Sequence, residues 1–157
     1  MRRLIPAALL LVAALAALAD SPPPPPRTRQ FYSPNRKFVA LSEPATNTIT
    51  TYRVGSGGTF SKLWSMQGWE RDAWLADDGV HFVASYHGMN LIPKNFERDM
   101  TMLRFYANGK LVKTVGLDEI VQDQTKLEET VSHYFWGHFL GRDEKGRIMV
   151  YSVEGKE

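Results

Sequence analysis

The chain has 157 residues, which is enough for one domain with its own hydrophobic core. It contains no cysteine, so disulfides, thiol catalysis and thiolate metal sites are excluded. There are 19 lysines and arginines against 17 acidic residues, and Arg2 and Arg3 account for the excess. The remainder is formally neutral and lacks the cationic surface that non-specific nucleic-acid binding requires, so no nucleic-acid partner is expected.

Residues 1–19 have the three parts of a secretory signal peptide. A basic start precedes an apolar run from Leu4 to Leu18, and Ala17 and Ala19 place small residues at the two positions that signal peptidase reads. The apolar run is shorter than the roughly 20 residues that span a bilayer. We therefore expect export to the periplasm or the extracellular space, without stable membrane insertion after cleavage. An uncleaved membrane anchor is the alternative.

A proline-rich linker is predicted over residues 20–30. Five consecutive prolines, Pro22–Pro26, favour an extended polyproline II conformation and cannot donate hydrogen bonds to a sheet. The segment is interpreted as a semi-rigid spacer. A docking ligand for an aromatic groove is the alternative function of such a run.

From residue 31 onward, short strands alternate with turns. Strands are predicted over residues 37–42, 46–54, 59–66, 72–76, 80–86, 101–107, 110–115, 134–140 and 147–153. Asp77-Asp78-Gly79 and Asn108-Gly109 supply the turn residues of two hairpins. Phe60 and Trp64 are four residues apart, so they are expected on one face of their strand. Trp64 and Trp74 are both predicted to be core residues.

One helical segment interrupts the strands near residues 117–131. Apolar residues three or four apart predict short helices over 117–122 and 126–131, the second beginning at a Thr125/Glu128 capping box. Residues 88–98 are predicted to form a long loop, and residues 154–157 a polar tail. The whole pattern predicts an all-β domain over residues 31–153, an antiparallel meander that is open or sandwich-like.

An internal repeat lies within this meander. Phe-Val-Ala occurs at 38–40 and again at 82–84, an offset of 44 residues, after a polar turn in both places. The segment 33–40, Ser-Pro-Asn-Arg-Lys-Phe-Val-Ala, resembles the Ser-Pro-Asp-Gly-Lys-x-Ile/Val-Ala turn and strand of TolB-like and WD40-like β-propeller repeats, and 77–84 resembles a second copy. Asn35-Arg36 departs from the Asp-Gly of that pattern. The resemblance implies blade-like four-stranded units and a binding surface, and it carries over no catalytic residue.

The chain is too short to close a ring of such units. At about 44 residues each, the part after the linker makes three blades at most, whereas closed propellers usually have four or more. An open stack leaves strand edges unpaired, and unpaired edges invite another chain. We therefore expect a protein partner or a homo-oligomer.

No catalytic or metal site emerges from the sequence. His133 and His138 are five residues apart, so on a regular strand they face opposite sides, and no zinc-ligand spacing is present. Asp77 and Asp78 are adjacent on a turn, where local backbone bonding explains them. We expect no catalytic residue, metal or cofactor.

Four residues are predicted to form a ligand-binding surface. Trp69 lies between strands, where an exposed indole can stack on a sugar or a peptide. Tyr86, His87 and Asn90 lie at the start of the long 88–98 insertion, and long loops in compact domains are often functional. The indole folding back over a sheet end is the alternative for Trp69.

The leading hypothesis from the sequence is an exported, non-enzymatic β-repeat domain that acts as a protein-interaction or self-assembly module. A carbohydrate- or envelope-binding accessory module is the first alternative, with a glycan as ligand. A hydrolase whose site is assembled only in three dimensions is the second.

Overall fold

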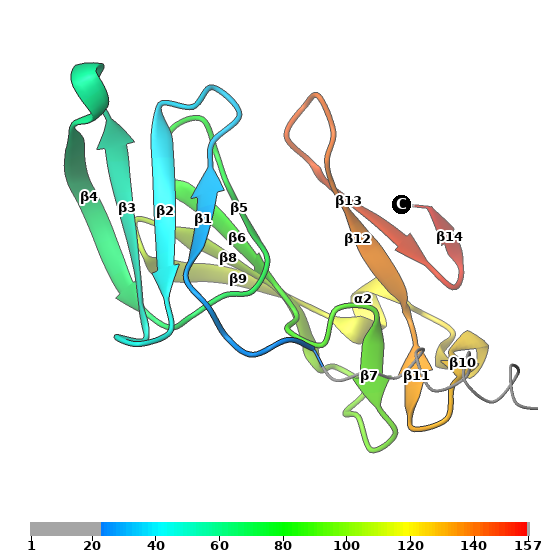
Figure 1. Ribbon diagram of the computed structural model, residues 1–157. Helices are drawn as coiled ribbons and strands as arrows, with labels where there is room; N and C mark the ends of the chain where they lie inside the picture. Colours follow the sequence, from blue (N-terminus) through cyan, green and yellow to red (C-terminus); the bar gives the residue numbers. More distant parts are fainter. Residues whose placement is uncertain (1–22, 157) are drawn as a thin grey trace, which may run out of the picture.

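The structure is a computed structural model that describes residues 23–156 (Figure 1). The predicted signal peptide and the start of the linker lie outside the described residues. The strands are β1 (Arg29–Tyr32), β2 (Phe38–Glu43), β3 (Thr48–Val54), β4 (Phe60–Gln67), β5 (Ala73–Leu75), β6 (His81–Ser85), β7 (Leu91–Pro93), β8 (Thr101–Ala107), β9 (Lys110–Gly116), β10 (Glu128–Glu129), β11 (His133–Phe135), β12 (Gly137–Arg142), β13 (Ile148–Ser152) and β14 (Gly155–Lys156). One short helix, α2 (Leu117–Ile120), follows β9.

The strands form four antiparallel sheets, which confirms the predicted all-β class. Two sheets have four strands, in the orders β1-β2-β3-β4 and β5-β6-β8-β9. Two have three strands, in the orders β12-β13-β14 and β10-β11-β7. Except for the small β10-β11-β7 sheet, each is a meander in which successive strands are neighbours. The connection from β6 to β8 leaves its meander to form β7, which pairs with β11 (Figure 1).

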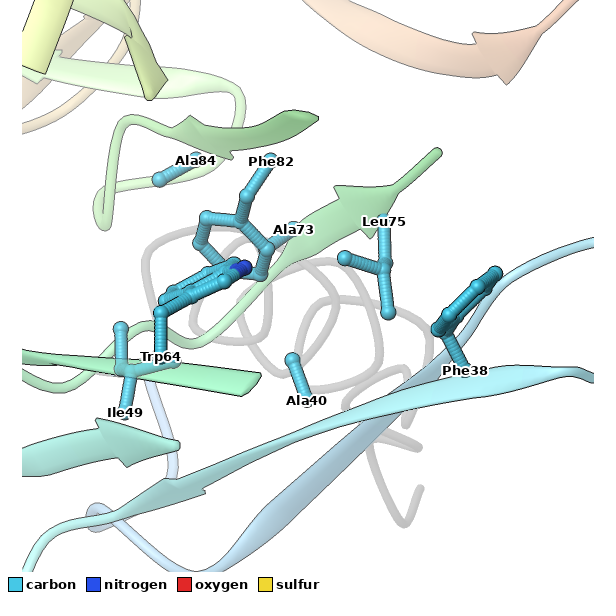
Figure 2. Close-up of a cluster of buried hydrophobic side chains, with 8 residues drawn as sticks. All are labelled: Phe38, Ala40, Ile49, Trp64, Ala73, Leu75, Phe82 and Ala84. Atoms are coloured by element: carbon cyan, nitrogen blue, oxygen red, sulfur yellow. The ribbon is translucent and has the colours of Figure 1, made fainter. Parts of the chain in front are cut away.

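The first core lies between the two four-stranded sheets, and Figure 2 shows the buried side chains that both sheets direct into it. The repeated Phe-Val-Ala segments occupy equivalent places, in the second strand of each sheet. Phe38 and Ala40 from β2 are buried in the same cluster as Phe82 and Ala84 from β6. Strand alternation sends the two outer residues of each triplet to one face, so the repeat builds both halves of this core.

A second core joins the remaining elements. Its buried residues come from β7, β8, β13, α2 and the segments on either side of β10 and β11; they are Ile92, Met102, Leu117, Ile120, Val121, Leu127, Trp136 and Val150. Trp136 is fully buried, and its indole Nε1 donates to the Met89 carbonyl at 2.8 Å. That bond satisfies the one polar atom of the side chain inside an apolar cluster.

Both predicted tight hairpins are present. Asn108 and Gly109 have φ of 50° and 74° between β8 and β9, the two positive values that a two-residue hairpin turn of this hand needs. Gly79 has φ of 69° in the turn between β5 and β6. A Cβ at Gly79 would lie 2.4 Å from Phe38 Cδ1, so glycine is required here for space as well as for backbone conformation.

The helical prediction is right only in its first half. Residues 117–120 form α2, but the segment 126–131 is not a helix: a 3-10 turn covers 124–126, and β10 follows. The side chain of Asp123 accepts the Thr125 amide at the start of that turn, so the Thr125/Glu128 capping box is not used. Leu127 is buried in the second core, and its neighbours on both sides are exposed.

Other boundaries also differ from the prediction: β1 begins at Arg29, inside the predicted linker, and β14 lies in the predicted polar tail. The 88–98 segment is not a continuous loop, because residues 91–93 form β7. The predicted strand 134–140 is two strands, β11 and β12, which belong to different sheets. Gly137 has φ of 138° at the break, and a Cβ there would lie 2.1 Å from the Tyr151 carbonyl oxygen. The close approach of β13 therefore requires glycine and bends the chain between the sheets.

Phe60 and Trp64 do not share a face. Thr51 pairs with Trp64 and Tyr52 with Lys62, so Leu63 is an extra residue in β4. A bulge of this kind shifts the alternation by one residue. Phe60 is consequently exposed, whereas Trp64 is buried in the first core as predicted and donates its indole N–H to the Gly79 carbonyl at 2.8 Å.

Candidate functional site: a cleft between three terminal strands

One cavity lies where three sheets meet. Strands β1, β5 and β12 are each the first strand of a sheet, so each has one edge without a neighbour in its own sheet. All three contribute residues to a cleft of about 430 Å³, which is lined by Phe31, Asp72, Ala73, Trp74, Ser85, Met89, His138, Phe139, Leu140 and Gly141. The cleft therefore lies beside one free edge of each of three sheets.

The lining is mainly apolar and aromatic with a few polar groups. Trp74 and Phe139 meet edge to face across the cleft, with ring centroids 5.9 Å apart. Trp74 is half-buried and faces this space, so only part of the core role predicted for it is realised. Asp72 is half-exposed, and the nearest cation is Arg29 at 3.9 Å, beyond hydrogen-bond distance. An apolar lining with a few polar groups is typical of ligand sites.

A second and larger hollow, of about 830 Å³, gathers the turns at one end of the same three sheets. In each turn an Asn or Asp side chain accepts the backbone amide two residues on: Asn35 at 2.9 Å, Asp78 at 2.8 Å and Asp143 at 3.0 Å. These turns lead into β2, β6 and β13, the second strand of each meander. The third turn, around Asp143, has the same side-chain to backbone hydrogen bond, although the internal repeat in the sequence includes only the first two turns.

The turn hollow carries one histidine–carboxylate pair. His81 Nδ1 lies 2.6 Å from Asp78 Oδ2, and both side chains are about half-exposed. The residues that line the hollow include no serine, threonine, cysteine or tyrosine. A nucleophilic site needs a hydroxyl or thiol beside the histidine that acts as its base. The His81–Asp78 pair has none in the lining of this hollow, so we interpret it as a pair that stabilises the turn. Asp78 also accepts the amides of Val80 and His81, so the pair belongs to the local turn.

Hydrogen bonds shift the acidity of the turn carboxyls. Partial burial opposes ionisation of Asp78, but hydrogen bonds from His81 and Val80 outweigh it and hold the pKa below its ordinary value. At Asp143, the backbone and side-chain hydrogen bonds from Arg147 lower the pKa. Both carboxylates are therefore stabilised as anions by donors of their own turns.

The structure brings two of the four predicted ligand residues together. Trp69 and His87 are in ring contact, with centroids 5.5 Å apart, although they are 18 positions apart in the sequence. Tyr86 packs instead against the second core, where burial raises the pKa of its hydroxyl, and Asn90 is exposed. None of the four lines the cleft between β1, β5 and β12.

Trp69 is half-buried, and protein groups surround it. Its indole N–H donates to the Arg27 carbonyl at 2.9 Å, and the Arg71 guanidinium lies over the ring at 5.2 Å. With His87 at the ring edge, the indole is held against its own chain. This arrangement matches the alternative stated above, in which the indole folds back over the end of a sheet.

A buried carboxylate organises the surroundings of Trp69. The Glu70 side chain is only 7% exposed; its Oε1 and Oε2 accept from Arg104 Nη2 at 3.0 and 2.8 Å, and its Oε2 lies 2.7 Å from His87 Nε2. Ser42 Oγ accepts the Glu70 amide and donates to the Glu70 carbonyl. These bonds join Ser42 of the first four-stranded sheet, Arg104 of the second, and His87 at the start of the segment that leads from β6 to β8. Only the tertiary fold brings them together, because the partners lie 17 to 34 positions apart.

Two findings bear on cofactors and membranes. Within residues 23–156, no group of three or more histidine, aspartate or glutamate side chains is placed to hold a metal ion. In the same described range, no helix is long and apolar enough to cross a bilayer.

Comparison of the chain with protein-family models, with curated proteins and with solved structures finds no match.

Proposed function

We propose that this protein is an exported, non-enzymatic interaction module that binds an extended polypeptide in the cleft between β1, β5 and β12. The observation that carries the proposal is the convergence of three terminal strands on one apolar cavity. Export rests on the sequence of residues 1–19.

The backbone supplies the first part of the argument. A terminal strand has amide and carbonyl groups on one edge that no strand of its own sheet engages. An extended peptide beside such an edge gains main-chain hydrogen bonds, while alternate side chains enter pockets. Trp74, Phe139 and Leu140 provide aromatic and aliphatic surface for those side chains, and Asp72 provides a half-exposed negative charge for a basic one.

The repeat supplies the second part. Three meanders that each begin with a strand, an Asx-capped turn and a strand are consistent with blade-like units of the propeller type. In such units the first strands lie together near the axis, where ligands bind. We propose that sheets β1–β4, β5-β6-β8-β9 and β12–β14 are such units, arranged as an open set.

The outer terminal strands offer a competing surface. In β9, Leu111 and Val112 are 55% and 64% exposed, but lysines at 110 and 113 flank them. Charged side chains and bulges are the usual protection of a sheet edge, and β9 also pairs with β8 through two register shifts. The cleft has the more favourable chemistry for a partner.

The test is selection of unstructured 12-residue peptides by phage display against the full chain, followed by titration of selected synthetic peptides. The Leu140→Asp variant changes an exposed cleft residue, and Leu111→Asp is the matched change on β9. We expect Leu140→Asp to weaken binding at least about tenfold, because it places a charge in an apolar contact, and Leu111→Asp to leave it unchanged. Equal binding by both variants, or loss only in Leu111→Asp, would overturn the cleft proposal.

Self-association is tested in the same material. A second copy that uses the cleft would give a dimer in light scattering that Leu140→Asp dissociates and Leu111→Asp does not. A dimer dissociated only by Leu111→Asp would assign the interface to β9.

A further inference from the structure

Arg71 is a largely buried cation that has no acid partner among residues 23–156. The residue is 8% exposed, and its Nε is inaccessible to solvent and has no hydrogen-bond acceptor. Within residues 23–156, its guanidinium forms no ion pair and donates no hydrogen bond. Of the three guanidinium nitrogens only Nε is buried in this way, and an N–H of a charged group that is buried without an acceptor is unfavourable.

Neither neighbouring carboxylate forms an ion pair with Arg71. Both carboxylate oxygens of Glu70 accept hydrogen bonds from Arg104, and Oε2 also contacts His87. Asp72 has Arg29 as its nearest cation, at 3.9 Å. Arg29 and Arg104 thus each have a carboxylate nearby, and Arg71 forms no ion pair with either one. Trp69 attracts the charge through its ring face at 5.2 Å, but a ring face replaces few of the hydrogen bonds that water gave.

We propose that Arg71 is the centre of an oxyanion-binding site at the end of the first core, beside Trp69 and His87, which takes a carboxylate or a phosphate group. The planar guanidinium matches both anions, because each can accept two parallel N–H bonds. Arg29 lies beside the Arg71 backbone, since its Nε donates to the Arg71 carbonyl at 3.1 Å. The half-exposed His87 ring lies at the edge of Trp69, with its Nε2 2.7 Å from Glu70 Oε2.

This site is separate from the peptide cleft. Arg71, Trp69 and His87 do not line the cleft, whereas Asp72 does. The proposal therefore stands on the unpaired guanidinium alone and does not depend on peptide binding.

The test measures thermal unfolding of the full chain in inorganic phosphate, in succinate and in chloride at equal ionic strength. An anion that binds the folded state alone raises the unfolding midpoint. We expect phosphate or succinate to raise it above the chloride value, and the larger rise identifies which oxyanion the site prefers. Equal midpoints in all three salts would overturn the proposal.

The variants Arg71→Met and Arg53→Met assign the effect to one residue. Arg53 also lies over an aromatic ring, that of Phe38 at 5.9 Å, but it is exposed. Arg71→Met should weaken anion binding at least about tenfold, as loss of hydrogen bonds from a charged group does, while Arg53→Met should retain it. Removal of an unpaired charge should also leave the midpoint in chloride unchanged or higher. Anion effects that persist in Arg71→Met would overturn the assignment.

A second measurement uses only the wild-type protein and so does not depend on whether a variant folds. The Nε–H resonance of Arg71 in the wild-type protein should shift on titration with the preferred anion and stay fixed with chloride. A resonance that responds equally to both would contradict a site.

Discussion

At the scale of single residues, Gly79 shows how sequence and packing act on one position. Its positive φ is a turn requirement that the Asp-Asp-Gly triplet already indicates. The contact with Phe38 is a packing requirement, because the ring from the first sheet lies against the turn of the second. Gly146 occupies the matching turn of the third sheet with φ of 80°, yet a Cβ there would meet nothing within 4 Å.

This pair of glycines separates backbone strain from steric clash. Gly146→Ala should lower the free energy of unfolding by about 1 kcal/mol, the usual cost of an L-residue in that conformation. Gly79→Ala should cost that amount plus about 1 to 3 kcal/mol for overpacking against Phe38. Urea denaturation of both variants gives the difference. Equal losses would mean that the Phe38 ring moves aside freely.

The Glu70 cluster gives a second prediction for single residues. Glu70→Gln leaves Arg104 facing a neutral amide in a largely buried place, and we expect a loss of about 2 to 3 kcal/mol in the free energy of unfolding. Glu129→Gln, in an exposed ion pair with Lys94, is the control and should change stability little. Chemical denaturation measures both. A Glu70→Gln variant as stable as the control would show that the pair's desolvation offsets its attraction.

At the scale of elements, the capped turns are the recurring device. In each of the three meanders, a side-chain oxygen accepts a hydrogen bond from one backbone amide in the turn between the first strand and the second. Asn35 adds a bridge between two turns, because its backbone amide donates to Asp77 Oδ1 at 2.8 Å and its side-chain amide donates to the Asp77 carbonyl at 3.0 Å. The turns thus hold the first two sheets together at one end.

The turn carboxylates predict how stability depends on pH. Since the pKa of Asp78 and of Asp143 is lower in the folded state, both contribute stability above the unfolded value of about 4, and this is lost as pH falls through the folded pKa. Melting curves between pH 3 and 6 should show a falling midpoint at the acid end. The double variant Asp78→Asn/Asp143→Asn should fall less steeply, while Glu144→Gln should follow the wild type. Identical slopes in all three proteins would contradict this origin.

At the scale of the whole molecule, two cores of different construction divide the chain. The first fills the space between two complete four-stranded sheets. The second is bounded by a short helix, a small sheet and the three-stranded β12–β14 sheet, of which only Val150 contributes a buried apolar side chain to the cluster. Local stability follows buried apolar contact, so the two parts should open at different free energies.

Hydrogen exchange measured by mass spectrometry tests this difference. Peptides covering β2, β3 and β6 should be protected longest, because these are inner strands over the first core. Peptides covering β13 and β14 should exchange earlier, through local opening. Uniform protection across both parts would instead indicate one cooperative unit.

The sequence alone determined the strand and turn pattern of the meanders, including both tight hairpins, because alternation and turn residues act over a few positions. It failed at Leu63, at Gly137 and over 126–131, where a bulge, the approach of β13 and burial of Leu127 override local pattern. It named Trp69 and His87 singly, but their contact, the unpaired charge on Arg71 and the cleft between β1, β5 and β12 depend on segments far apart in the chain. Those features belong to the tertiary structure, because only packing decides which distant side chains meet and which charge is left without a partner.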